Sequence, residues 1–106
     1  MANNYKNSKV DLSSTSITTL YTCPASTTAL VKSILVSEDS GNADTITLTI
    51  TSGSAVFSLY KVKAVGANGT VELLTAPLVV QASEILKVTA ATANRLHVVA
   101  SYLEIT

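Results

Sequence analysis

Residues 44–62, DTITLTITSGSAVFSLYKV, decide the fold class of this chain. From Ile46 to Ile50, aliphatic residues alternate with threonines, which is the period-two pattern of a strand with two unlike faces. The following pair, Gly53-Ser54, suits a type II′ hairpin turn, because glycine readily adopts the positive φ that this turn requires. The stretch therefore predicts a two-stranded antiparallel hairpin.

The same alternation predicts which residues pair across this hairpin. The expected pairs are Ile50 with Phe57 and Leu48 with Leu59 on the apolar face, and Thr49 with Ser58 and Thr47 with Tyr60 on the other. A shift by one residue would place apolar side chains opposite polar ones on both faces. The pattern therefore favours a single register.

The rest of the chain carries similar strand signals. Fifteen threonines and abundant valine and isoleucine favour strands over helices. Strand-like runs occupy residues 8–13, 16–22, 29–37, 60–65, 70–75, 77–81, 84–90 and 94–105. The pair Asn68-Gly69 predicts a type I′ turn that joins two of these runs in a second hairpin. About eight short strands indicate an all-β fold, a single antiparallel β-sandwich that is jelly-roll-like.

The length of 106 residues fits one domain with one core. Residues 1–8, MANNYKNS, lack strand alternation, so we expect a flexible N-terminal arm there and a β-sandwich domain over residues 9–106. This N-terminus also lacks the apolar core of a signal peptide, which predicts synthesis in the cytoplasm. The charge-free run 12–31 is half serine and threonine and contains a proline, which argues against a membrane span.

Low charge is the most unusual global property of the chain. Only 13% of residues are Asp, Glu, Lys or Arg, seven acids balance seven bases, and the mean hydropathy is +0.40. A small surface with so little charge is poorly protected against association, so we expect partners to cover much of it. A homo-oligomer is expected, with a trimer as the working hypothesis. Nucleic acid is not expected, because binding to phosphates needs clustered Lys and Arg.

Catalytic chemistry has few candidates. Cys23 would need a base to act as a nucleophile, and the one histidine, His97, lies far away in the predicted last strand. A free cysteine just before a proline is better interpreted as a small buried hydrophobe. A lone histidine inside a strand is likewise a weak candidate for a metal ligand. We expect no catalytic residue, no metal site and no cofactor.

The acidic residues do not form a recognisable site. Four oxygen-bearing residues share one loop: Glu38, Asp39, Asn42 and Asp44. Clustered carboxylates can bind calcium, but the spacing does not match an EF-hand loop, so a solvated turn is the favoured interpretation. Glu72, Glu84 and Glu104 lie one to a strand and form no acid pair of the glycosidase type. The chain is therefore not expected to be an enzyme.

The threonine face of the hairpin is the candidate surface for self-contact. The residues expected to touch another copy are Thr47, Thr49, Val56, Tyr60 and Val62. A face in contact with water more often carries lysine and glutamate, whereas aromatic side chains anchor interfaces. A plain solvated threonine-rich face remains the alternative.

Two stretches, ITTLYTCPASTTALVKSILVSE (17–38) and APLVVQASEILKVTAATANRLHVVASYLEI (76–105), resemble a recurring pattern in small virion proteins of tailed bacteriophages. In that pattern a strand ending in LYT-x-PA leads to an A-x-VKSI strand, and a strand like HVVASYLEI closes the domain. The match covers about half of the chain, and its motifs are structural. This chain has Ser26 where a turn glycine is common, and Ala82-Ser83 where glycine followed by an acid is common.

The resemblance implies a β-sandwich displayed in several copies on a virion. It favours a non-enzymatic head decoration (cement) protein that binds a major capsid protein or another virion protein and reinforces the assembled capsid. A neck or tail component is the alternative within the same class. A glycan-binding sandwich for attachment to the host surface is the alternative from another class. The absence of tryptophan and the scarcity of other aromatic residues argue against it.

Overall fold

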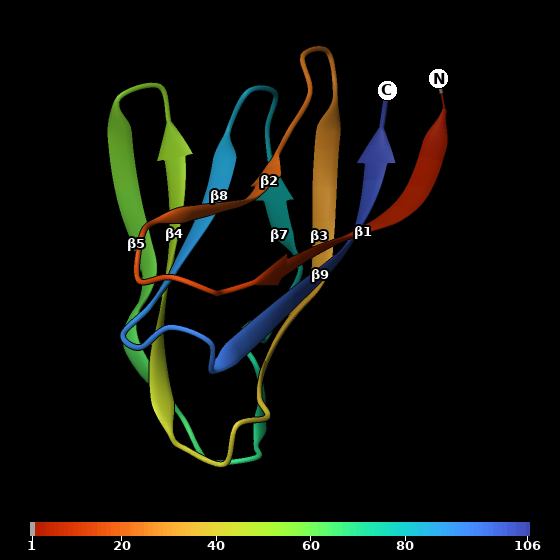
Figure 1. Ribbon diagram of the computed structural model, residues 1–106. Coiled ribbons are helices and arrows are strands. Elements are labelled where there is room, and N and C mark those ends of the chain that lie inside the picture. Colours follow the sequence, from red (N-terminus) through yellow and green to blue (C-terminus); the bar gives the residue numbers. More distant parts are fainter. Residues whose placement is uncertain (1) are drawn as a thin grey trace.

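The computed structural model describes residues 2–106, which form nine β-strands and no helix (Figure 1). The strands are β1 (Asn3–Asp11), β2 (Thr18–Thr22), β3 (Thr28–Glu38), β4 (Asp44–Ser52), β5 (Ala55–Val65), β6 (Thr70–Glu72), β7 (Leu78–Val80), β8 (Ile85–Ala90) and β9 (Leu96–Ile105). The prediction of an all-β fold is confirmed. The described residues accordingly contain no helix that could cross a membrane.

The strands form two antiparallel sheets that face each other. One sheet has the order β1-β9-β3, and β6 and β7 both pair with the outer edge of β3. The other sheet has the order β2-β8-β4-β5. This is the strand order of a jelly roll in which β6 and β7 together take the place of one strand. The predicted single antiparallel β-sandwich is therefore confirmed.

The connections lie at two ends of the sandwich (Figure 1). Both termini lie at one end with the turns β2–β3, β4–β5 and β7–β8, and we call this the terminal end. The opposite end, called the loop end, carries residues 12–17, 39–43, 66–69 and 91–95. Each sheet therefore presents one inner face, one outer face and two sets of loops.

The core fills the space between the sheets with alternate side chains of each strand. The largest fully buried side chains include Leu12, Ile34, Ile46, Leu48, Leu73, Leu86 and Leu96. Burying an aliphatic side chain of this size contributes about 1.5–3 kcal/mol relative to leaving it exposed. Cys23 belongs to this core, with 1% of its surface exposed.

The predicted hairpin turn at Gly53-Ser54 is confirmed. Gly53 has a φ of +61°, and Ser52 pairs with Ala55 across the two turn residues. The register next to the turn is also as predicted, with Ile50 opposite Phe57 and Thr49 opposite Ser58. Turn chemistry therefore determines the pairing of the first few residues on each side.

Further from the turn, the predicted register is wrong. Leu48 pairs with Tyr60 instead of Leu59, because an extra residue of β5 forms a bulge after Ser58. A second shift follows, and there Val62 has a φ of +53° while its N–H donates to Thr47 Oγ1 at 3.1 Å. Thr47 therefore does not pair with Tyr60.

Residues 3–8 belong to the sandwich, which corrects the prediction of an arm outside it. They form the first part of β1, which pairs with β9 without interruption from Asn3–Ile105 to Asp11–His97. Lys6 supplies a reason, because its ammonium lies 2.9 Å from the buried carboxylate of Glu104. The sandwich therefore begins before residue 9. Met1, the first residue of the predicted arm, lies outside the described part of the chain.

The turn predicted at Asn68-Gly69 is displaced by one residue. The N–H of Gly69 donates to the carbonyl of Gly66 at 3.0 Å, so the central residues are Ala67 and Asn68. Of these two, Asn68 has the positive φ, at +53°. The strands on either side, β5 and β6, lie in different sheets, so this connection crosses between sheets and does not close a hairpin.

Candidate functional site

Cys23 and His97 lie at opposite ends of the sandwich. The thiol of Cys23 donates to the carbonyl of Thr27 at 3.3 Å, at the terminal end. His97 lies at the loop end, and β9 separates it from Ile105, the partner of Thr28, by about 27 Å at the rise of a strand. The two side chains therefore do not form a nucleophile–base pair.

His97 contacts two carboxylates, one on each side of its ring. Nε2 lies 3.3 Å from Asp11 Oδ1, and Nδ1 lies 3.4 Å from Asp39 Oδ2. The two carboxylates approach different ring nitrogens, so they do not converge on one ion. Within residues 2–106, no group of three His, Cys, Asp or Glu side chains could hold a metal ion.

Glu38, at the start of the acidic loop, links the connection after β3 to the connection after β5. The carboxylate of Glu38 accepts hydrogen bonds from the hydroxyl and N–H of Ser40 and from the N–H groups of Gly41 and Asn68. Burial alone would raise the pKa of Glu38, but these donors outweigh it and hold the pKa at about 2. Asp44 turns away and accepts from Thr92 N–H at 3.1 Å. The carboxylates are thus used inside the fold and do not converge on a cation.

A polar cluster around the buried carboxylate of Glu104, not anticipated from the sequence, joins the two sheets near the terminal end. Its members are Lys6 on β1, Tyr21 on β2, and Glu104 and Tyr102 on β9. Tyr21 donates its hydroxyl to Glu104 Oε2 at 2.5 Å, and the rings of Tyr21 and Tyr102 lie 4.2 Å apart. Hydrogen bonds from Lys6 and then Tyr21 lower the pKa of Glu104 below its ordinary value despite burial. The available signal was a glutamate at an inward position of the last strand.

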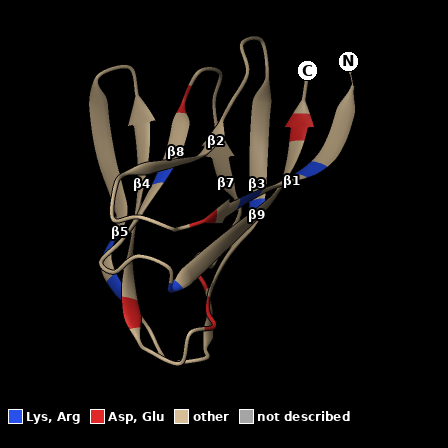
Figure 2. Ribbon diagram, viewed as in Figure 1, with Lys and Arg blue, Asp and Glu red and all other residues tan. Residues whose placement is uncertain are grey.

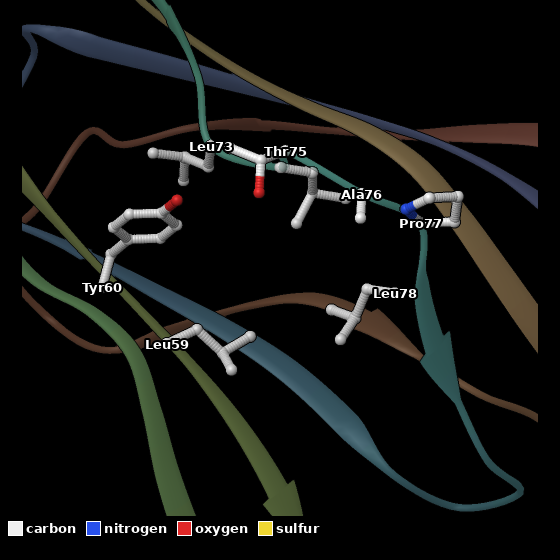
Figure 3. A pocket seen from close by; sticks show the side chains of 8 residues that line it. Leu59, Tyr60, Leu73, Thr75, Ala76, Pro77 and Leu78 are labelled. Atoms are coloured by element: carbon white, nitrogen blue, oxygen red, sulfur yellow. The ribbon is translucent and has the colours of Figure 1, made fainter.

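One pocket of about 290 Å³ opens between the edges of the two sheets. It is lined by Leu59, Tyr60, Leu73, Leu74, Thr75, Ala76, Pro77 and Leu78 (Figure 3). Tyr60 reaches it because the bulge in β5 places this residue opposite the buried Leu48. The opposite wall is the segment between β6 and β7, where the chain does not pair with β3. The lining is mainly aliphatic and brings together no catalytic group.

The five residues predicted for self-contact do not share one face. Thr47 and Thr49 lie on the outer face of β4, since they alternate with the buried Leu48. Val56 and Val62 are 62% and 60% exposed on β5. Tyr60 packs partly against the core and lines the pocket. The bulge after Ser58 therefore separates Tyr60 from the threonine face.

The β4–β5 hairpin is uncharged over its turn and the adjoining parts of both strands. No Asp, Glu, Lys or Arg occurs from Thr45 to Tyr60, and the upper part of the hairpin is free of charge in Figure 2. Four apolar side chains are exposed on β5: Val56, Phe57, Leu59 and Val62. This strand is the last of its sheet, so its outer backbone groups have no strand partner among residues 2–106. An apolar unpaired edge of this kind is a natural site for association.

The sequence and the fold were both compared with those of known proteins. No protein-family model matches the chain, and no curated protein sequence matches it. A solved structure with a similar fold is a pentameric capsid protein isolated from metagenomic phage sequences, with a TM-score of 0.46 and 20% sequence identity. The match covers 94% of this chain and 61% of that protein, so the chain spans about three fifths of its length. Likeness at this level assigns no family.

Proposed function

We propose that this chain is a non-enzymatic structural protein of a tailed-bacteriophage virion, and specifically a head decoration (cement) protein. It binds a major capsid protein or another virion protein and reinforces the assembled shell. The resemblance of residues 17–38 and 76–105 to small virion proteins supports the class. A rigid jelly roll with little surface charge and exposed apolar edges suits permanent association.

The uncharged β4–β5 hairpin carries the proposal. It extends to the terminal end of the sandwich and exposes Val56 and Phe57 beside an unpaired strand edge. Aromatic and aliphatic side chains in such positions anchor protein interfaces when a partner covers them. We propose that this hairpin contacts the virion, and that Thr47, Thr49, Val56 and Val62 contribute to it. Tyr60 contributes indirectly by supporting β5 from the pocket.

Particle composition tests the location. A decoration protein should be present in hundreds of copies on purified particles, whereas a neck or tail component should be present in about six or twelve, as ring symmetry requires. Particles that lack the protein should release their genome at a lower temperature than complete particles. Equal release temperatures would contradict reinforcement, and a low copy number would favour the neck or tail.

Phe57→Lys tests the hairpin as the contact surface. The lysine places a charge at an exposed aromatic position of the hairpin, so binding to particles that lack this protein should weaken at least tenfold. Thr19→Lys is the matched control, because Thr19 is exposed on β2 of the same sheet. If both variants bind like the wild type, the virion contacts another surface. Binding to a glycan array without binding to particles would favour host attachment instead.

A further inference from the structure

An apolar row crosses the outer face of the β1-β9-β3 sheet. Paired residues in neighbouring strands point to the same side of a sheet, so the row follows directly from the register. Tyr5 pairs with Leu103, Leu103 with Leu30, and Leu30 with Val79. The outermost members are the most exposed, at 74% for Tyr5 and 51% for Val79. Lys32 extends along the same face and holds its ammonium 5.4 Å from the Tyr5 ring.

A second row lies nearer the loop end of the same face and is charged at its ends. Lys9 pairs with Val99, Val99 with Leu35, and Leu35 with Glu72. Leu35 is 42% exposed and Val99 is half-buried. The row thus has a cation at one edge of the sheet, an anion at the other, and two aliphatic residues between them. The carboxylate of Glu72 is held in place by Ser33 and by the N–H of Ile34.

We propose that a second copy of this chain docks on this face, with a two-fold axis parallel to the strands between β9 and β3. Rotation about such an axis reverses the order of the strands in the second copy. Each row keeps its position along the strand direction, so it faces the same row of the second copy. Lys9 then faces Glu72 of the second copy, and Val99 faces Leu35 of the second copy. In the other row Tyr5 faces Val79 of the second copy. An axis perpendicular to the strands would instead place Lys9 over Tyr5, so charge complementarity selects the parallel axis.

The size of the face sets the strength of this contact. Strands of nine or ten residues in β1 and β9 are about 30 Å long, and four strands span about 19 Å. The two copies together would bury on the order of 1,100 Å², which is at the low end for a specific interface. The free protein should therefore form a weak, concentration-dependent dimer. Many such contacts on a repeated shell would add through multivalency.

This inference keeps the expected homo-oligomer but proposes a two-fold dimer in place of the trimer, and it does not rest on the proposed virion role. It also uses the sheet that does not contain β5. One sheet would thus contact the virion and the other a second copy, so each subunit could bridge two neighbours. The failure of one contact leaves the other intact, and this makes the two proposals separable.

Sedimentation equilibrium of the purified chain, from about 10 µM to 1 mM, tests the dimer. Leu35→Lys should raise the dissociation constant at least tenfold, because each lysine meets Val99 of the second copy. The comparison variant is Val56→Lys, at an aliphatic position on β5 that is more exposed than Leu35 (62% against 42%), and it should dimerise like the wild type. Circular dichroism should show that both variants remain folded.

The charged ends of the second row provide an independent test of the axis. Lys9→Glu should weaken the dimer about fivefold at low salt, because it sets two carboxylates against each other. Lys61→Glu makes the same change in net charge on β5 and should have no effect. A wild type that stays monomeric at 1 mM would overturn the proposal. So would a dimer that is lost with Val56→Lys but retained with Leu35→Lys.

Discussion

Glu38 joins two loops at the loop end of the sandwich through one carboxylate. Its donors come from residues 40–41 on one side and Asn68 on the other, so the loops after β3 and β5 depend on the same side chain. Four donors on one buried carboxylate favour its charged form. The lowered pKa of Glu38, about 2, follows from this preference.

The depressed pKa of Glu38 predicts acid sensitivity. A carboxyl group whose pKa is lower in the folded than in the unfolded chain stabilises the fold above its unfolded pKa, near 4.5, and loses that contribution as pH falls toward 2. Glu38→Gln should therefore unfold more easily at pH 7 and show a weaker pH dependence between pH 5 and 2. Urea denaturation at a series of pH values measures both effects. An unchanged slope in the variant would contradict this role.

Tyr21→Phe should destabilise the protein by about 1–3 kcal/mol, because it removes a hydroxyl donor from the buried Glu104 carboxylate. Tyr60→Phe is a suitable control, since Tyr60 is only partly buried and lines the pocket. We expect less than about 0.5 kcal/mol for that change. Chemical denaturation at pH 7 compares the two variants. Equal effects would mean that the Tyr21 hydroxyl contributes no more to stability than the Tyr60 hydroxyl.

Strand β5 stores local strain at Val62. A β-branched residue at a φ of +53° is sterically unfavourable, and Val62 is 60% exposed, so little packing compensates for it. Val62→Gly should raise the free energy of unfolding by about 1 kcal/mol, because glycine adopts this φ freely. At Val56, which is paired in regular register, the change to glycine should lower stability by a similar amount. Thermal unfolding of both variants measures the contrast.

The strands and the hairpin turn were predictable because period-two alternation and Gly53 act over a few residues. The bulges in β5 were not, because Val62 is a residue that local rules assign to an extended strand. The two turns in which this chain departs from the virion-protein pattern were only partly predictable. Ser26 and Ser83 have φ values of +59° and +69°, so each turn contains a left-handed residue. In the resembling virion proteins, glycine is common at the position of Ser26 and at the position just before Ser83.

Long-range partners account for the remaining differences. The first strand looked irregular because its pairing depends on β9 and on the contact between Lys6 and Glu104, which are distant in sequence. At the interruption between β6 and β7, the Glu72 carboxylate takes the place of a backbone carbonyl and accepts the N–H of Ile34, while the Ile34 carbonyl accepts the N–H of Leu73. Within the candidate self-contact surface, the direction of Tyr60 was unpredictable because a bulge turns it away from the threonine face. The contact of these five residues with another copy stays a prediction.

At the scale of the whole molecule, deleting residues 1–8 should be strongly destabilising. The deletion removes most of β1, uncovers the edge of β9 and leaves the Glu104 carboxylate without Lys6. An uncovered central strand presents unpaired backbone groups that promote aggregation. We expect lower thermal stability and visible association by light scattering. A truncated chain as stable and soluble as the full one would show that β1 is dispensable.

The pairing of β1 with β9 brings residues 2 and 106 together, with the Thr106 N–H donating to the Ala2 carbonyl at 3.0 Å. A short linker could therefore join the two ends and let the chain be reopened at a loop of the opposite end, giving a circular permutant with the same core. A peptide fused to either terminus would leave the molecule at the same point, on the β1–β9 side of the terminal end (Figure 1). A cargo at that point and one inserted at residues 39–43 would emerge on opposite sides. The distance between two displayed ligands could thus be set by choosing the site of attachment.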